Sequence, residues 1–390
     1  MRQAEGREVV IVEAVRTPIG RGHREKGYYK DTHPNALLAK CYTEVIERSG
    51  VEAAEVEDVI AGCVQQFGEQ GFNIARNAWL QAGLPIETSG TTVDRQCGSA
   101  QQAVNFSAAL IAAGVHDAMI GSGVEHMGHL PFAAGMKTQE DFGYAFTPEL
   151  MAKHNLIGQG LGAEMIADQW EISRAELDEL AVRSHRLAHQ ATEEGRFERE
   201  IVPITVDGNE YVTDQGIRPD TSLEGLSQLK PAFKPDGKIT AGNASQISDG
   251  AAAVLLMSAE KAKALGLKAR ARIVDQTTVG CDPVKMLEGP IPATRKILKR
   301  NSMKIDDIDL FEINEAFAPV VAAWRRELSP DMDRVNVNGG AMALGHPLGS
   351  TGARLITTLL HELERSDKEI GFVTMCCGGG LGTGTLIQRV

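Results

Sequence analysis

The sequence predicts an α/β fold made of two similar halves, with a further domain inserted into the first half. Short apolar runs typical of buried strands alternate with stretches of helical periodicity, and this alternation indicates an α/β protein with a mostly parallel sheet. The same order of segments recurs 252 residues later. Between the copies, the alternation gives way to a long segment rich in Gly, Met, Pro and His. We therefore expect a duplicated unit interrupted by an insertion.

The first half begins with a strand followed by a helix. Residues 8–14 are an apolar run closed by Arg16-Thr17-Pro18, and residues 35–48 have a helical period that ends at Ser49-Gly50. Glycine and proline delimit the later elements in the same way. These are strands over 58–64 and 118–121 and helices over 73–82 and 101–113.

Three groups of segments match between the halves. Each match joins the same kinds of element at nearly the same separation. One match could arise by chance in any α/β protein, but three in the same order favour a duplication. The matches are residues 45–51 and strand 56–60 with 297–303 and strand 308–312, the helix opening at 97–99 with that at 348–350, and the strand at 119–120 with that at 372–373.

The insertion is predicted over residues 122–244. Its one long helix, 174–194, begins after Ser173, which has capping-box spacing to Glu176. Regular alternation returns near residue 250. The expected division is residues 1–121 with 245–268 as the first half, 122–244 as the inserted loop domain, and 269–390 as the second half.

Composition excludes several classes of protein. A formal charge of −12 with no cluster of Lys and Arg argues against nucleic acid as a partner. The first twenty residues carry charges throughout, and no run of eighteen apolar residues occurs, so we expect neither a signal peptide nor a membrane span. The six cysteines are scattered without metal-type spacing, which favours reduced thiols in a cytoplasmic protein over disulfides or a zinc site.

Cys97 is the first candidate for chemistry. A polar segment ends at Cys97, and a long Ala-rich run poor in charge begins at Gly98, so the cysteine is expected where an extended segment turns into a buried helix. Unpaired N–H groups and the positive end of the helix dipole favour thiolate over thiol at such a position. Cys97 is therefore either a nucleophile or a small buried cysteine of a core helix.

The second half offers partners for Cys97 in three segments. Polar residues at 314–315 follow a strand, as ligand contacts do in α/β proteins. His346 lies in a glycine-rich loop, where it is either a residue without a role or the base for a thiol and donor to an oxyanion. Cys376 stands close before three glycines whose bare amides could form an oxyanion hole. It is otherwise a core cysteine, and Cys377 is most simply a packing residue.

Other patterns carry little weight. The glycines at 158–162 and 378–384 lack the spacing and context of a dinucleotide or phosphate-binding loop. His126-x-x-His129 has no further ligands at suitable spacing, which favours a structured loop over a metal site. No metal is expected.

The segments that carry these residues resemble the thiolase family along essentially the whole chain. The resemblance implies a five-layered αβαβα core made of two similar halves, with a loop domain inserted in the first half. It also predicts a 3-ketoacyl-CoA thiolase of the bacterial β-oxidation type. The matching segments are residues 16–20, 91–104, 125–128, 229–249, 314–318, 339–354 and 376–380.

The resemblance implies a role for each site residue. Cys97 is expected to accept the acyl group, His346 to activate Cys97, and Cys376 to act as general acid and base. Asn314 is expected to hold a water that forms one oxyanion hole with His346. The backbone N–H groups of Cys97 and Gly378 are expected to form the other.

Coenzyme A is implied as a substrate, with no permanently bound cofactor. Lys230 and Lys234 either supplement Arg218 at a CoA phosphate or are surface charges. The family also implies a homodimer or homotetramer and allows a β-oxidation partner subunit. The implied CoA contacts are Arg218, Leu229, Phe233, Ala241, Ser245 and Phe317.

The expected direction of the reaction, degradation and not biosynthesis, depends on departures from the pattern of biosynthetic members. Gly158-Gln159 stands where acetoacetyl-CoA thiolases usually carry His-Met, which leaves room for a larger acyl group and favours degradation. The alternatives are a biosynthetic acetyl-CoA acetyltransferase and a thiolase-like lipid carrier without catalysis, although carriers tend to lose the catalytic residues. Cys377 occupies a position that is usually aliphatic, which weakens the choice of Cys376 over its neighbour.

Overall fold

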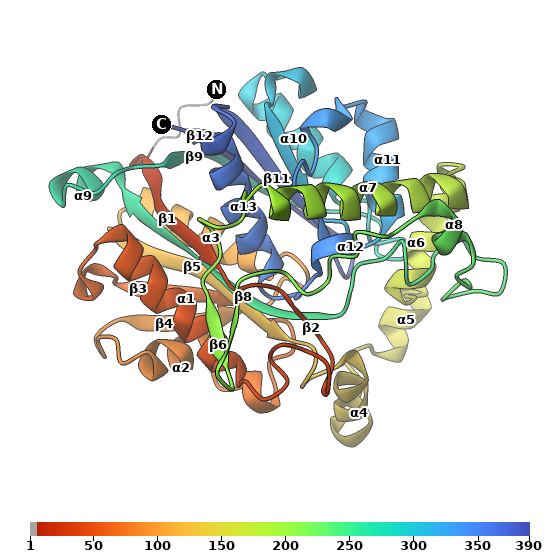
Figure 1. The fold of residues 1–390 in the computed structure, drawn as a ribbon, viewed down its shortest axis with the longest axis horizontal. Helices are drawn as coiled ribbons and strands as arrows, with labels where there is room; N and C mark the ends of the chain where they lie inside the picture. The colour runs from red at the N-terminus through yellow and green to blue at the C-terminus, as the bar shows by residue number, and fades with distance from the viewer. Residues whose placement is uncertain (1–5) are drawn as a thin grey trace.

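The structure is a computed structural model that describes residues 6–390 (Figure 1). The first half of the fold alternates strands and helices and closes with a strand that follows a long insertion. Its elements are β1 (Val9–Arg16), β2 (Gly20–Arg21), α1 (Pro34–Ser49), β3 (Asp58–Gly62), α2 (Ile74–Gln81), β4 (Ser89–Val93), α3 (Ser99–Ala112), β5 (Ala118–His126), β8 (Ser248–Ser258) and α9 (Ala259–Ala264).

The second half repeats this order. β3, α3 and β5 start at residues 58, 99 and 118, and their counterparts β10, α13 and β11 start 252 residues later at 310, 351 and 370. The predicted duplication is therefore confirmed. The elements of this half are β9 (Ala271–Gly280), α10 (Pro290–Asn301), β10 (Leu310–Ile313), α11 (Ala318–Leu328), α12 (Ala341–Leu344), α13 (Thr351–Arg365), β11 (Ile370–Cys377) and β12 (Leu381–Arg389).

The strands form one path whose two ends are related by the duplication. The order is β4-β3-β5-β8-β1-β9-β12-β11-β10. β1 and β9 join the two halves through a short ladder, in which Val10 pairs with Arg272 and Ile11 with Ala271. The strands of the first half and those of the second half, which meet at this ladder, are called the first and the second sheet below.

The prediction of a mostly parallel sheet is wrong. Only β3–β4, β3–β5 and β10–β11 pair in parallel within this sheet, and the other pairs are antiparallel. The parallel pairs are those with a helical crossover between their strands. β12 follows β11 through a tight turn, where Gly379 and Gly380 have φ of +81° and +78°, and a turn this short forces antiparallel pairing.

The layers follow from which helices face which sheet. α3 and α13 contact each other and strands of both halves, so they form the middle layer. α1 and α2 cover the outer face of the first sheet, and α10 and α11 that of the second (Figure 1). Apolar clusters fill the spaces between these layers. The predicted five-layered αβαβα core is confirmed.

The inserted segment lies between β5 and β8. The expected boundary at residue 122 falls inside β5, which continues to His126 and pairs there with Asp249. The predicted capping box of Ser173 and Glu176 is present at the start of α7. The other elements were not apparent from sequence periodicity. The inserted elements are α4 (Phe132–Phe142), α5 (Pro148–His154), α6 (Gln159–Gln169), α7 (Arg174–Glu193), β6 (Ile204–Val206), β7 (Asn209–Tyr211) and α8 (Leu223–Ser227).

None of the helices within residues 6–390 is both long enough and apolar enough to cross a bilayer.

Candidate active site

Cys97 lies in the turn between β4 and α3, as the sequence predicts. The turn is sharp, because Gln96 has a φ of +50°. The carboxylate of Asp94 accepts a hydrogen bond from the N–H of Gln96 at 2.6 Å, and Oγ of Ser99 accepts one from the N–H of Arg95 at 2.9 Å. These contacts hold Cys97 against the start of α3, with its side chain buried.

Burial outweighs the expected effect of the helix start on the Cys97 thiol. Burial raises the pKa of Cys97 to about 11, although hydrogen bonds from the backbone N–H groups of Gly378 and of Cys97 itself oppose the rise. The expectation that this position by itself favours thiolate is therefore wrong for the free protein. A nucleophilic Cys97 needs a base.

His346 is buried in the loop before α13, so water has little access to its imidazole. Its Nδ1 lies 2.6 Å from Oγ1 of Thr351. The Thr351 hydroxyl donates its single proton to the carbonyl of Pro347 at 2.8 Å, so Oγ1 accepts from Nδ1–H. The contact fixes the tautomer and leaves the lone pair on Nε2.

The imidazole of His346 is held neutral. Burial, and then the positive charge of Arg354, lower its pKa to about 3. Nδ2 of Asn314 donates to Nε2 of His346 at 3.3 Å. Oδ1 of Asn314 is buried and has no hydrogen-bond partner among the described residues. The lone pair on Nε2 of His346 can accept a proton, although the lowered pKa makes the imidazole a weak base. The Asn314 amide keeps an acceptor free for a water or a substrate group.

Cys376 lies near the end of β11, fully buried. Burial raises the pKa of its thiol well above the usual value, and the thiols of Cys97 and Cys377 raise it further. The two sequence-predicted cysteines, which are far apart in the chain, are thus brought together. Gly378, next after β11, presents its N–H to the sulfur of Cys97.

Cys377 lies on the opposite face of β11 from Cys376, in the apolar cluster that also holds Cys97. Its Sγ lies where a side chain on Gly98 would be, 2.7 Å from the ideal Cβ position. It belongs to the apolar cluster around α3 and α13, whereas Cys376 belongs to the cluster on the other side of the second sheet. The alternation along β11 and the contact with Gly98 agree with a packing role for Cys377, which stays a prediction.

The residues proposed to contact CoA lie mostly together. The ring of Phe233 packs edge-to-face against that of Phe317, with centroids 6.0 Å apart. Phe317 also forms a bridge with Ala244, beside Ser245. Leu229 packs against Gly242, next to Ala241. These five residues therefore share one region.

Among the described residues, no hydrogen bond or ion pair joins Arg218 to this region. Its N–H donates instead to Nδ1 of His185 on α7 at 3.1 Å, and its side chain is exposed. Lys234 lies 3.0 Å from Asp168 and is an ion-pair partner there. The surface-charge interpretation of Lys234 therefore gains support.

A cavity of about 560 Å³ opens beside the catalytic candidates. Gln96 and Gly378 form its inner end, directly adjoining Cys97 and Cys377 in the chain. The amide of Gln159 lies over Gly378, since an ideal Cβ on that glycine would be 2.9 Å from Nε2 of Gln159. Apolar side chains of the inserted segment and of the loop before α10 form the remaining wall, among them Met136, Tyr144, Phe146, Met151, Leu156 and Met286.

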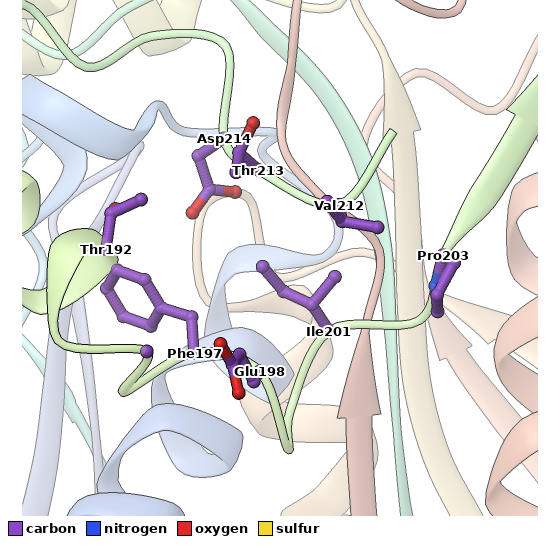
Figure 2. Close-up of a pocket in the computed structure, with 9 residues that line it drawn as sticks. Thr192, Phe197, Glu198, Ile201, Pro203, Val212, Thr213 and Asp214 are labelled. Atoms are coloured by element: carbon purple, nitrogen blue, oxygen red, sulfur yellow. The ribbon is translucent and has the colours of Figure 1, made fainter. Parts of the chain in front are cut away.

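A second cavity, of about 340 Å³, lies beyond the end of α7 (Figure 2). Phe197 and Asp214 line it, and both also contact Arg16. None of the predicted catalytic residues lines this cavity. The chemistry is therefore expected at the larger cavity.

Sequence reasoning missed two contributors to the site. Thr351 fixes the His346 tautomer, and its only signal is a hydroxyl at the first position of the helix after the histidine loop. Arg354 lies one helical turn further on and acts on His346 by its charge. Neither position stands out in composition or spacing.

Comparison with known proteins agrees with this arrangement. The family model of the thiolase N-terminal domain matches residues 9–260, and that of the thiolase C-terminal domain matches residues 267–389. A steroid 3-ketoacyl-CoA thiolase of Mycobacterium tuberculosis is 45% identical over 390 residues, covering 98% of this chain and 94% of that protein.

Two further relatives span both proteins in the same way. A 3-ketoacyl-CoA thiolase of Serratia proteamaculans is 48% identical, covering 98% of this chain and 99% of that one. The crystal structure of the Bacillus anthracis acetyl-CoA acetyltransferase superposes with a TM-score of 0.89 at 40% identity and covers 100% of both chains. The chain belongs to the thiolase family.

Proposed function

We propose that this protein is an acyltransferase that cleaves a 3-ketoacyl-CoA with free CoA, giving acetyl-CoA and a shortened acyl-CoA. The observation that carries the proposal is the meeting of two buried thiols, Cys97 and Cys376, with the N–H of Gly378 directed at the sulfur of Cys97. One thiol can then carry the acyl group while the other moves a proton.

The first half of the reaction acylates Cys97. Nε2 of His346 removes the thiol proton, and the thiolate attacks the keto carbon of the substrate. The C–C bond to the acetyl-CoA unit breaks, and the Cys376 thiol protonates the enolate that leaves. Two oxyanion holes stabilise the developing charges, one made by His346 with a water on Asn314, the other by the N–H groups of Cys97 and Gly378.

The second half returns the enzyme to its starting state. The Cys376 thiolate removes the proton of incoming CoA, and the CoA sulfur attacks the thioester carbonyl on Cys97. The acyl-CoA leaves, and the Cys97 thiolate recovers its proton from His346. The two substrates therefore react in a ping-pong order.

CoA is proposed to bind along the inserted segment, as a substrate and not as a resident cofactor. The region of Leu229, Phe233, Ala241, Ser245 and Phe317 presents an apolar wall with exposed parts, which suits the pantetheine and adenine groups. The exposed guanidinium of Arg218 is assigned to a CoA phosphate.

The cavity beside Gly378 favours an acyl group larger than acetyl. Its volume of about 560 Å³ lies in the range that holds ligands of drug size, about 300–1,000 Å³. The alternative is a biosynthetic acetyl-CoA acetyltransferase, which the likeness to the Bacillus anthracis structure favours. A two-carbon acyl group would leave most of this cavity without apolar contact.

Intact mass after incubation with acetoacetyl-CoA tests the proposed chemistry. We expect one covalent acetyl adduct on the wild type, none on Cys97→Ala, and an unchanged adduct on the control Cys41→Ala, which removes another buried thiol. Cys376→Ala should lose turnover in both directions, thiolysis and condensation, while Cys377→Ala should retain turnover. An equal adduct on Cys97→Ala would overturn the assignment.

Thiolysis rates across 3-ketoacyl chain lengths separate degradation from biosynthesis. Met136→Trp, which fills the cavity, should lower kcat/KM for long substrates and spare acetoacetyl-CoA. The matched control is Met165→Trp, because Met165 is an exposed methionine of the inserted segment that does not line the cavity. A sharp preference of the wild type for acetoacetyl-CoA would favour the biosynthetic alternative.

The assembly is proposed to be a homodimer or homotetramer in the cytoplasm. β4 lies at the edge of the sheet, and the fully exposed ring of Phe72 and the exposed Ile86 lie in the segments before it, as expected for pairing with a second copy. The free thiols suit a reducing compartment. Sedimentation velocity tests the oligomer: a monomer would contradict it. A β-oxidation partner subunit stays a prediction.

A further inference from the structure

Glu312 and Arg354 form a buried carboxyl–guanidinium pair that the proposed reaction does not use. Burial raises the pKa of the Glu312 carboxyl, and the charge of Arg354 opposes that rise. Each side chain is only 3% exposed. Nη1 of Arg354 lies 3.6 Å from Oε2 of Glu312, which is longer than a charge-assisted hydrogen bond of about 2.7–2.9 Å. All three guanidinium nitrogens and Oε2 lack a hydrogen-bond partner among the described residues. A buried pair with so few hydrogen bonds is costly for folding.

The pair joins β10 to α13, and the contact between Asn314 and His346 joins the residue just after β10 to the loop before α13. Glu312 lies in β10 two residues before Asn314, so both side chains leave the chain on the same side. Arg354 lies on α13 one turn after Thr351, which holds Nδ1 of His346. A shift of α13 against β10 would therefore change the ion pair and the 3.3 Å contact from Asn314 to His346 together.

The charge of Arg354 also acts on His346. It disfavours the protonated imidazole, in the same direction as burial. Among the described residues, Arg354 is the charged group that lowers the pKa of His346. The remaining buried charges that act on the pair are Glu315 and Glu362 from the second half, and Arg16, Glu200 and Asp214 from the cluster around β1.

We propose that Glu312 and Arg354 are positioning residues for the thiolase reaction. Attraction between them holds α13 in register with β10, so that Nε2 of His346 faces the Asn314 amide. The cation of Arg354 keeps that imidazole unprotonated and ready to accept the Cys97 proton. Glu312 lets the cation remain buried. This inference rests on the proposed function of His346.

The test is the pH dependence of kcat/KM for acetoacetyl-CoA thiolysis, followed from about pH 3 to about pH 9 so that an acid limb set by His346, whose pKa is about 3, falls inside the range. Arg354→Met removes the cation near His346, so the imidazole gains a proton more readily. The acid limb of the pH profile of kcat/KM should therefore move to higher pH. We expect a displacement of about one pH unit or more, or about a tenfold loss at a fixed acid pH. Glu312→Gln leaves the cation in place, so its acid limb should stay at or below that of the wild type.

Opposite behaviour of the two variants separates positioning from mere structural support. If the pair only stabilised the fold, both variants would lose activity at every pH without moving the limb, and that result would overturn the inference. The double variant Glu312→Gln/Arg354→Met leaves neither charge buried alone. It should melt above Glu312→Gln and keep the raised acid limb, which maintains the test if a single variant does not fold.

Two controls complete the design. Arg300→Met breaks an ion pair with Asp275 between α10 and β9 and should leave the pH profile unchanged. Mass measurement of the acyl adduct on wild-type Cys97 tests the proposed function separately. If the wild type forms no adduct, the proposed function fails; if it does and the limbs coincide, only the positioning role fails.

Discussion

The sulfur of Cys377 occupies the space that a side chain on Gly98 would need. An ideal Cβ on Gly98 would lie 2.7 Å from Sγ of Cys377 and 3.0 Å from Cγ2 of Thr383. Gly98 follows Cys97 directly and precedes the first residue of α3. Close packing between the two halves therefore sets the position of the proposed nucleophile.

Gly98→Ala should consequently disturb both stability and acylation. Overpacking of this kind costs about 1–3 kcal/mol in the free energy of unfolding, and the displaced turn should slow formation of the Cys97 adduct. Cys377→Ala removes the nearest clashing atom, so the double variant should recover part of both losses. Denaturant unfolding and adduct formation measure the two effects. Additive losses in the double variant would contradict the packing account.

Thr351→Val should impair catalysis with little effect on substrate binding. Valine keeps the shape of threonine but cannot accept the proton from Nδ1 of His346, which leaves a buried donor unsatisfied. That loss is worth about 1–3 kcal/mol, so kcat should fall by about 10- to 100-fold while KM changes little. Thr351→Ser keeps the hydroxyl and is the matched control. An equal loss of kcat in the serine variant would point to packing instead of tautomer control.

Asp249 should make stability depend on pH near neutrality. Burial raises its pKa to about 7, and its Oδ2 has no hydrogen-bond partner among the described residues. The folded protein thus binds this proton more tightly than the unfolded chain, whose aspartate has a pKa near 3.8. The contribution to stability is fully present below that value and is lost as pH rises to about 7.

Asp249→Asn removes this titration. Relative to the wild type, the variant should therefore gain stability at about pH 8 and gain less, or lose, at about pH 4. Oδ1 of asparagine can still accept the hydrogen bond from the N–H of Gly128, which is 2.8 Å long in the wild type. Thermal unfolding at the two pH values measures the difference. Parallel shifts at both values would show that Asp249 does not titrate in this range.

Local patterns in the sequence sufficed for much of the fold and for the proposed nucleophile. The capping box at Ser173 and the turn before α3 depend on neighbouring residues, so spacing alone reveals them. The duplication was readable because equivalent elements keep a constant separation. The antiparallel direction of β8 and β12 could not be read from the sequence, because it depends on how the chain returns from the insertion and from the turn at Gly379 and Gly380.

The supporting residues of the site could not be predicted for the same reason. Thr351 and Arg354 matter only through contacts that the packing of α13 creates. The environment of Cys97 was misjudged because its burial depends on the other half of the chain. In the inserted segment, α5 has no buried residue and so gives no clear helical period.

Arg16 should be the most sensitive buried charge outside the site. Its guanidinium donates to both carboxylate oxygens of Asp214, at 2.7 and 3.0 Å, and to Glu200 at 2.5 Å, and it lies 5.0 Å from the ring of Phe197. Arg16→Met leaves two buried carboxylates without their cation, so unfolding should require about 3–5 kcal/mol less. Arg16→Lys keeps the charge but cannot reproduce the planar fork, and should recover only part of the loss. Arg389→Met, which breaks a pair with the exposed Asp367, should cost less than about 1 kcal/mol. Denaturant unfolding of the three variants measures the ranking, and a lysine variant as stable as the wild type would show that charge alone is what Asp214 and Glu200 require.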